Sequence, residues 1–328
     1  MVLIALLVLV TVSMSMLSQY FLTVDNVLSA LALAAPLGLI AIGMTFVVLI
    51  GGIDLSVGSM LALSAVTLGI LNESGVPTGL AAVIALGVGT LCGLINGILV
   101  SRLQLPSIVV TIATLAVYSG LALAISGGRS FPVGEEIAFL GRGYIAGIPM
   151  PVVLLLAVFA LAYVILTSTT YGDQLYALGT NARALRFAAL RSGAMTLSAY
   201  IVSGFLSGLA ALVFASTVSS AKANFGSGYE LAAVTIVVVG GTALTGGRGT
   251  LWGTLLATVV IALLQNGMSI AFVSSEVQTM YVGGALIITA LIYRWLPQLT
   301  RFTSRPRQDR NRTVTSTPTT STSAPTPS

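Results

Sequence analysis

The chain has 328 residues, of which 56% are hydrophobic and only 7% are charged. A soluble globular domain carries about 25% charged residues, so this composition excludes a soluble protein. The mean hydropathy of +1.03 instead fits a protein embedded in a lipid bilayer, where about 20 apolar residues make one crossing. The chain has no histidine, which excludes His-based catalytic triads and His-ligated metal sites.

The single cysteine and the single lysine exclude further kinds of functional site. Cys92 lies in an apolar stretch and can form neither an internal disulfide nor a CxxC site, so we expect a small core residue. Lys222 follows Ala221, so the sequence GxxxxGK, with which a P-loop binds ATP, is not present. We therefore expect a chain that is not an enzyme, holds no metal or cofactor, and leaves any ATP hydrolysis to a separate protein.

Apolar runs bounded by polar residues, glycine or proline predict an all-α, polytopic membrane bundle of about ten transmembrane helices. The expected crossings are 2–18, 27–50, 55–71, 78–100, 107–126, 151–168, 194–218, 231–245, 250–271 and 278–295. The run at 231–245 is short for a crossing, and the glycine pairs at 240–241 and 246–247 could break it or make it re-entrant. Pro106 fits the opening of the fifth helix, where its missing N–H group costs nothing.

The distribution of basic residues predicts the orientation of these crossings. With residue 1 on the inner side, eleven of the 14 basic residues fall in inner segments and three, Arg129, Arg142 and Lys222, fall in outer ones. Basic residues favour the cytoplasmic side of a membrane, so we expect both termini to be cytoplasmic. The formal net charge of +5 then reflects topology, and no nucleic-acid partner is expected.

Three segments outside the predicted crossings are distinct. Residues 127–150 form the longest outer loop, and residues 169–193 form the longest inner loop. Residues 303–328 end in a run of Thr, Ser and Pro that cannot form a packed core, so we expect a disordered cytoplasmic tail. Residues 1–302, which include both loops, form the expected transmembrane domain.

Asp54 is the one ionisable residue that we expect at a helix end inside the membrane. It lies within the sequence GGIDLSVGS, which begins at Gly51. Gly51 and Gly52 can end the second helix, and Asp54 can then cap the third helix by accepting hydrogen bonds from its free N–H groups. The alternative is that this segment, including Ser56, belongs to a gate or a translocation path.

Small residues and amides inside the predicted helices indicate how the bundle packs. Glycines four residues apart let helix backbones approach closely in lipid. They occur at Gly89, Gly93 and Gly97, at Gly204 and Gly208, and at Gly249 and Gly253. Three amide side chains also lie in or near crossings, and they could either bond between helices or line a polar passage. These amides are Asn96, Gln265 and Asn266.

The inner loop contains one short predicted helix, over residues 182–190. Asn181 is a good N-cap for it, and Gly193 stands where such a helix would end. Arg183 and Arg186 share one face, opposite leucine and alanine residues. The helix could lie on the membrane surface or dock in a groove of a cytoplasmic partner, and the residues alone leave both open.

At these segments the chain resembles a known family. GGIDLSVGS resembles the segment typical of membrane permease subunits of bacterial ABC sugar importers, the ribose/xylose/arabinose/galactoside group. Residues 176–193 are similar to that family's ATPase-coupling loop. The sequences VVVGGTALTGGRGT and LLQNG, within 232–266, are similar to its C-terminal half. The resemblance extends over residues 20–295.

The resemblance implies a subunit of an ATP-binding cassette importer for a monosaccharide, a ribose-like pentose or a hexose, in the bacterial cytoplasmic membrane. Its partners would be ABC ATPase subunits, an extracytoplasmic sugar-binding protein and a second permease copy. We assign ATPase coupling to Tyr176, Gly179, Asn181, Arg183, Ala184 and Arg186. We assign a gate or translocation path to Gly51, Gly52, Asp54, Ser56, Asn96, Gln265 and Asn266.

Two alternatives stay open. One is an ABC permease for another small solute, such as a nucleoside, a signalling furanose or a branched-chain amino acid. The other, less favoured, is an ion-coupled secondary sugar transporter, since it needs coupling sites inside the membrane and Asp54 is the only ionisable candidate.

Overall fold

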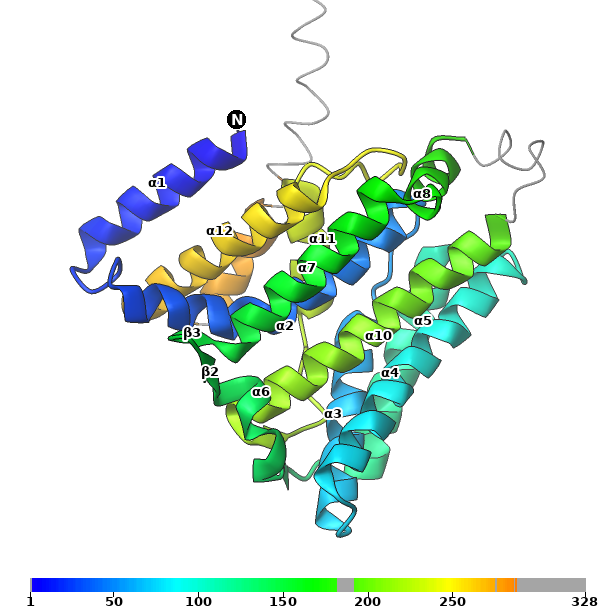
Figure 1. The fold of residues 1–328 in the computed structure, drawn as a ribbon, viewed down its shortest axis with the longest axis horizontal. Coiled ribbons are helices and arrows are strands. Elements are labelled where there is room, and N and C mark those ends of the chain that lie inside the picture. The colour runs from blue at the N-terminus through cyan, green and yellow to red at the C-terminus, as the bar shows by residue number, and fades with distance from the viewer. Residues whose placement is uncertain (1, 182–191, 275, 286, 288–328) are drawn as a thin grey trace, which may run out of the picture. The chain divides into compact units, whose positions relative to one another are not determined.

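A computed structural model shows the chain as a bundle of α-helices (Figure 1). It describes residues 2–181, 192–274, 276–285 and 287. The helices are α1 (Val2–Leu17), α2 (Val24–Leu49), α3 (Val57–Glu73), α4 (Thr78–Ser101), α5 (Ser107–Ser126), α6 (Ala138–Arg142), α7 (Met150–Ser168), α8 (Thr170–Thr180), α10 (Ser192–Val218), α11 (Tyr229–Val239) and α12 (Leu251–Ile270). Residues 276–285 are also helical. The all-α fold expected from the sequence is confirmed.

Six of the described helices are long and apolar enough to cross a membrane. They are α2, α4, α5, α7, α10 and α12, and they match expected crossings closely. Pro106 immediately precedes α5, as its sequence predicts. The shorter α1 and α3 have 16 and 17 residues and also coincide with expected apolar runs. Length and apolar composition therefore located most of the bundle.

The expected crossing at 231–245 is wrong as a full span. Its helix, α11, has eleven residues and extends about 16 Å at 1.5 Å per residue. The hydrocarbon core of a bilayer is about 30 Å thick. The helix stops at Gly240, and the chain then turns at Gly241, whose φ of +92° favours glycine. The first glycine pair of this segment therefore ends the helix.

Helix α2 lies at the centre of the bundle. Sixteen of its residues are buried, including every position from Ala35 to Leu49. It packs against α7, α10, α11 and α12. Helix α7 has a higher mean hydropathy but is much less buried, so the burial of α2 reflects its place in the bundle rather than its composition. It is therefore the element around which the other crossings are arranged.

Helices α4 and α10 lie side by side with their backbones in contact (Figure 1). A Cβ atom at Gly89 would lie 2.7 Å from Gly204 O and 2.8 Å from Gly208 Cα. A Cβ atom at Gly93 would lie 2.9 Å from Gly204 Cα. The four-residue glycine spacing thus produces the close helix approach that it predicts.

The expected outer loop, 127–150, is ordered. Strand β1 (Phe131–Pro132) pairs antiparallel with β4 (Ser220–Ala221), and β2 (Tyr144–Ile145) pairs with β3 (Ile148–Pro149). Between them lie a 3-10 turn, Glu135–Ile137, and α6. Ser216 Oγ of α10 donates to Ile137 O and accepts from Gly141 N, which fixes this region on the end of α10.

The expected inner loop, 169–193, is largely helical where the structure describes it. Helix α8 occupies Thr170–Thr180, and α10 begins at Ser192. Asn181 stands at the C-terminal end of α8, where its N–H donates to Ala177 O, so it ends one helix in addition to any role in the next. The predicted helix over 182–190 and the tail at 303–328 lie outside the described residues.

Candidate functional site

The expected coupling element α8 contacts the bundle through glycines from three separate segments. These are Gly51 at the end of α2, Gly179 in α8, and the pair Gly246 and Gly247 before α12, which we call the glycine junction. A Cβ atom at Gly246 would lie 2.7 Å from Gly51 N and 3.0 Å from Gly179 Cα. Gly51, Gly246 and Gly247 have φ values of +79°, +82° and +73°. Glycine is thus needed here for conformation as well as for space.

Backbone contacts hold the glycine junction together. Gly247 N donates to Leu49 O at 2.8 Å, which joins the loop before α12 to the last turn of α2. A Cβ atom at Gly179 would overlap the same Leu49 O and Gly247 N. Helix α8 is therefore in direct contact with both segments and cannot move toward them without moving them.

Side chains of α8 add fixed attachments on either side of the junction. The Tyr176 hydroxyl donates to Gly249 O at 3.1 Å, and the hydroxyls of Tyr171 and Ser198 lie 2.7 Å apart. Burial raises the pKa of both tyrosines, so these hydroxyls keep their protons at neutral pH. Thr169 caps the helix by accepting from Gly172 N. The helix is thus tied to the loop before α12 and to α10.

A second candidate site, which is polar, begins at Asp54, three residues beyond Gly51. Its side chain is fully buried, and its two carboxylate oxygens accept hydrogen bonds from different elements. Oδ1 accepts from Ser56 Oγ at 2.6 Å and from Ser56 N at 3.1 Å, and Oδ2 accepts from Ser203 Oγ of α10 at 2.9 Å. In the described part of the chain no salt bridge involves Asp54.

The capping role expected for Asp54 is fulfilled only in part. Helix α3 begins at Val57, with Ser56 as its N-cap residue, and Ser56 makes no side-chain cap bond. Asp54 lies further back and accepts from the N–H group of Ser56 rather than from the first turn of the helix. It bridges α3 and α10 instead, which the sequence did not indicate.

The hydrogen bonds continue from Asp54 into α4 and α5. Asn96 Nδ2 donates to Ser56 Oγ at 2.8 Å, and the Tyr118 hydroxyl lies 3.3 Å from Asn96 Oδ1. We call Asp54, Ser56, Asn96, Tyr118 and Ser203 the Asp54 network. It joins α3, α4, α5 and α10 in the interior, where polar groups need partners. The predicted Asp54, Ser56 and Asn96 meet here, whereas the sequence analysis missed Tyr118 and Ser203.

The segment between the two sites is anchored to α5 and α10. Ile53 N donates to Ser107 Oγ at 3.3 Å, and Thr111 Oγ1 donates to Ile53 O at 3.1 Å. Gly52 lies against Tyr200, whose hydroxyl would be 2.9 Å from a Cβ atom at that position. A short, braced segment therefore connects the glycine junction to the Asp54 network.

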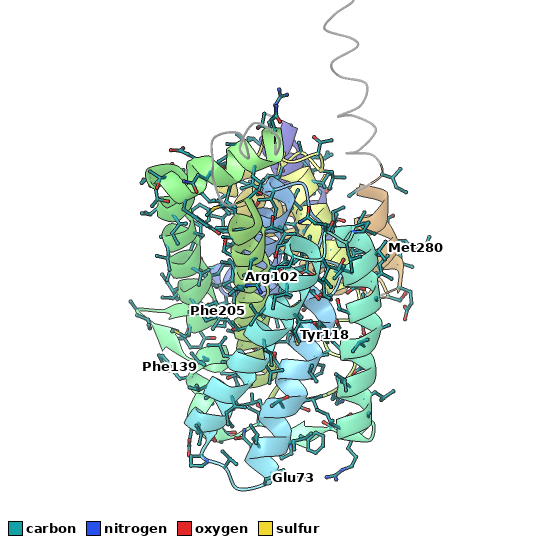
Figure 2. All side chains as sticks on the ribbon, turned by 90° about the vertical axis from the view of Figure 1, so that its right-hand side faces the viewer. Glu73, Arg102, Tyr118, Phe139, Phe205 and Met280 are labelled. Atoms are coloured by element: carbon teal, nitrogen blue, oxygen red, sulfur yellow. The ribbon has the colours of Figure 1, made fainter. Side chains whose placement is uncertain are left out.

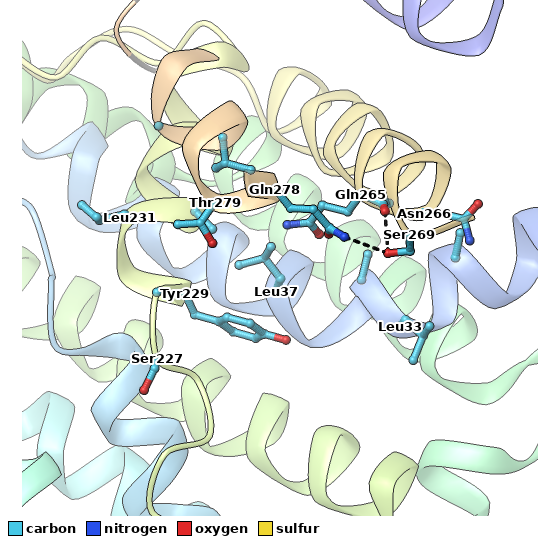
Figure 3. Close-up of a pocket in the computed structure, with 17 residues that line it drawn as sticks. Leu33, Leu37, Ser227, Tyr229, Leu231, Gln265, Asn266, Ser269, Gln278 and Thr279 are labelled. Atoms are coloured by element: carbon cyan, nitrogen blue, oxygen red, sulfur yellow. Dashed lines mark hydrogen bonds between the residues drawn. The ribbon is translucent and has the colours of Figure 1, made fainter. Parts of the chain in front are cut away.

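The remaining predicted path residues lie elsewhere. Asn266 and Asn26 exchange two amide hydrogen bonds, at 2.8 and 3.1 Å, which join α12 to the first turn of α2. Gln265 and Asn266 both line a pocket of about 380 Å³ (Figure 3). The predicted path residues thus form two groups, and the structure does not bring these two amides to Asp54.

Apolar helices that can cross a membrane, with polar groups bonded to one another in the bundle, define a multi-pass membrane protein. The chain belongs to the family described as branched-chain amino acid transport system / permease component, which matches residues 26–291. The transport-permease class predicted from GGIDLSVGS and the later segments is confirmed.

Curated relatives cover most of the chain. The ribose import permease protein of Haemophilus influenzae is 37% identical over 298 residues, which are 89% of this chain and 92% of that protein. The ribose import permease protein of Bacillus subtilis is 38% identical over 85% of this chain and 88% of its own length. The autoinducer 2 import system permease protein of Photorhabdus laumondii is 33% identical over 79% of each chain. No solved structure gives a significant match.

Proposed function

We propose that the chain is the membrane-spanning, non-catalytic subunit of an ABC importer for a monosaccharide, a ribose-like pentose or a hexose. Its similarity to two ribose import permeases over more than four fifths of its length carries the proposal. ATP hydrolysis then takes place on a partner chain, since this sequence contains no P-loop.

The proposed assembly contains two copies of this chain, ABC ATPase subunits on the cytoplasmic side and a sugar-binding protein on the outer side. It lies in the bacterial cytoplasmic membrane with both termini of the permease inside. The excess of basic residues in the expected inner segments supports this orientation. Helix α8, in one of those segments, then faces the ATPase.

The glycine junction suggests how ATPase motion reaches the membrane. Closure of the ATPase subunits pushes α8, together with the expected contacts Arg183, Ala184 and Arg186 that follow it. Gly179 touches the backbones of Leu49 and Gly247. The displacement of α8 therefore passes to the C-terminal end of α2 and, through the loop that contains Gly247, to the start of α12. From α2, the braced segment leads to the Asp54 network, which joins four helices. Access to the solute path changes as these helices tilt.

Reconstitution tests the coupling assignment. The permease is co-purified with its ATPase and binding protein, and radiolabelled D-ribose uptake and ATPase activity are measured in proteoliposomes. We expect the double variant Arg183→Glu, Arg186→Glu to lose sugar-stimulated ATPase activity and uptake together, because the charge change opposes docking. Arg102 is exposed and lies outside α8, so Arg102→Glu is the matched control and should retain both sugar-stimulated ATPase activity and uptake. Unchanged coupling in the double variant would contradict the assignment.

Autoinducer 2 is a second candidate solute. It is favoured by the similarity of the chain to autoinducer 2 import permeases, such as the Photorhabdus relative at 33% identity. The ligand of the co-purified binding protein distinguishes the two solutes directly. An ion-coupled sugar transporter would instead show uptake that uncouplers abolish and that persists after ATP depletion. Both oxygens of the Asp54 carboxylate accept hydrogen bonds from serine hydroxyls, which does not favour a proton or ion relay there.

A further inference from the structure

The pocket that contains Gln265 lies within one copy of the chain, between four segments. It is bounded by α2, the start of α11, the end of α12 and the helical residues 276–285. Its volume of about 380 Å³ falls in the range of small-molecule sites. Figure 3 shows amide side chains from α12 and from residues 276–285 on one side of it and Tyr229 on the other.

The polar groups of this pocket are neutral and partly unused. None of the lining residues carries a charge. Gln278 Nε2 donates to Ser269 Oγ at 3.1 Å and to Val273 O at 2.9 Å, which leaves its carbonyl oxygen available. In the described part of the chain, no hydrogen bond involves the Gln265 amide or the Tyr229 hydroxyl. The pocket therefore offers both donors and acceptors without a net charge.

The opposite wall is apolar. Leu33 and Leu37 of α2 line it beside the Tyr229 ring. That ring packs edge-on against Phe214, at 6.0 Å between centroids and 72° between planes, which fixes its position. An apolar wall that includes an aromatic ring and faces amides suits a solute ring with C–H groups on one face and hydroxyl groups around its edge.

We propose that this pocket is a binding site in each permease copy for one neutral, polyhydroxylated ring of monosaccharide size. The hydroxyl groups bond to the Gln265 and Gln278 amides, and the C–H face lies on Tyr229 and Leu37. The inference rests on the proposed function and deepens it, because it places a solute contact inside the protomer.

The chemistry of the pocket argues against other occupants. A zwitterionic amino acid would need charged or strongly polarised partners for its ammonium and carboxylate groups, and no charged side chain lines the pocket. A lipid acyl chain would leave the Gln265 amide without a partner. The sugar is held by a few neutral groups, so the binding is weak and permits release.

Cysteine protection tests the site directly. Cys92 is buried and is the only cysteine, so a Cys92→Ala background leaves no reactive thiol. Ser269→Cys then places one thiol at an exposed position on the pocket rim. The assembled complex in detergent is treated with a charged methanethiosulfonate reagent, with and without saturating D-ribose, D-xylose, D-galactose or L-leucine. We expect at least one sugar to slow modification several-fold and L-leucine to have no effect.

Two variants make the result specific. Gln265→Met keeps the side-chain length but removes the amide, and it should abolish protection while the labelling rate without sugar stays the same. Ser74→Cys, exposed beyond the end of α3, should be labelled at one rate with or without sugar.

Uptake by the same complex separates the two proposals. Sugar uptake with no protection at Ser269→Cys by any of the three sugars overturns the pocket and leaves the importer standing. Protection by a sugar in a complex that does not import it supports the pocket and contradicts the proposed function.

Discussion

At the scale of single residues, the carboxylate of Asp54 differs from an ordinary helix cap in the number of elements that depend on it. Ser56 and Ser203 donate to separate oxygens of the same side chain, and these donors come from α10 and from the start of α3. Removing the side chain leaves several buried donors without an acceptor, at about 1–3 kcal/mol for each. The residue thus fixes how α10 sits against α3.

Substitution of Asp54 should therefore depend strongly on the replacement. Asp54→Ala is expected to lower the Tm of the detergent-purified permease by several degrees. Asp54→Asn should have a smaller effect, because its amide keeps one acceptor oxygen and the Ser203 hydroxyl can accept from its NH₂ group. Asp25→Ala, at an exposed position in the first turn of α2, is the control and should lower the Tm less than Asp54→Ala does. Equal Tm values for Asp54→Ala and the wild type would show that the network contributes nothing to stability.

The sequence predicted part of this network, and the missing part has a physical explanation. Asp54, Ser56 and Asn96 stand out because charged or amide side chains are rare in apolar helices. Ser203 is one of several serines in α10, and its partner is 149 residues away in the sequence. Hydroxyls in membrane helices often bond to their own backbone, as Ser207 does. No local pattern therefore distinguishes the serine that binds Asp54 from the others.

At the scale of elements, apolar length located the crossings, but it did not predict α8, whose Gly179 contacts Leu49 and Gly247 at the glycine junction. Residues 170–180 were expected to be an inner loop because they are too polar to cross a membrane. Tyr171, Leu175 and Leu178 nevertheless recur at helical spacing on the packed side of α8, and both leucines are buried. That spacing is enough to predict a helix over these residues. The glycine pair at 240–241 indicated a break in the crossing expected at 231–245, and the structure adds that Gly240 packs against the first turn of α12.

The glycine junction provides the sharpest test of an element's role. In Gly179→Ala, the added methyl group overlaps Leu49 O and Gly247 N, so α8 must shift or the loop before α12 must open. We expect ATP-driven uptake to fall at least tenfold, a loss of about 1.4 kcal/mol or more in coupling, while ATPase binding persists. Uptake is measured in proteoliposomes, and gel filtration of the same preparation shows whether the complex is intact.

Helix α4 supplies a matched control for this substitution. Gly87 is also inside a helix, but no atom lies within 4 Å of a Cβ atom built there. Gly87→Ala should therefore leave uptake at the wild-type level, with at most a small gain in stability from the better helix former. If Gly179→Ala imports as well as Gly87→Ala does, the junction is not a tight contact between α8 and the membrane helices.

At the scale of the whole molecule, charge separates the two ends of the bundle. Arg129 pairs with Glu73 at 2.7 Å and Arg142 with Glu135 at 2.9 Å, so two of the three basic residues expected outside are matched by acids. All four side chains are exposed enough that these pairs contribute little stability. Arg102 lies toward the other end of α4 from Glu73 (Figure 2). The proposed orientation rests on the number of basic residues expected on each side and not on their pairing with acids, because Asp and Glu contribute little to this bias.

Labelling from one side of the membrane tests that orientation. Ser74 and Leu103 are exposed and flank α4, whose 24 residues extend about 36 Å at 1.5 Å per residue, enough to cross a bilayer. In the Cys92→Ala background, an impermeant maleimide should label Ser74→Cys in right-side-out vesicles and Leu103→Cys only in inside-out vesicles. The reverse pattern would place the glycine junction and α8 on the outer side, where no ATPase can reach them. Labelling of both positions from the same side would show that α4 does not cross, and the charge argument would then fail together with the orientation.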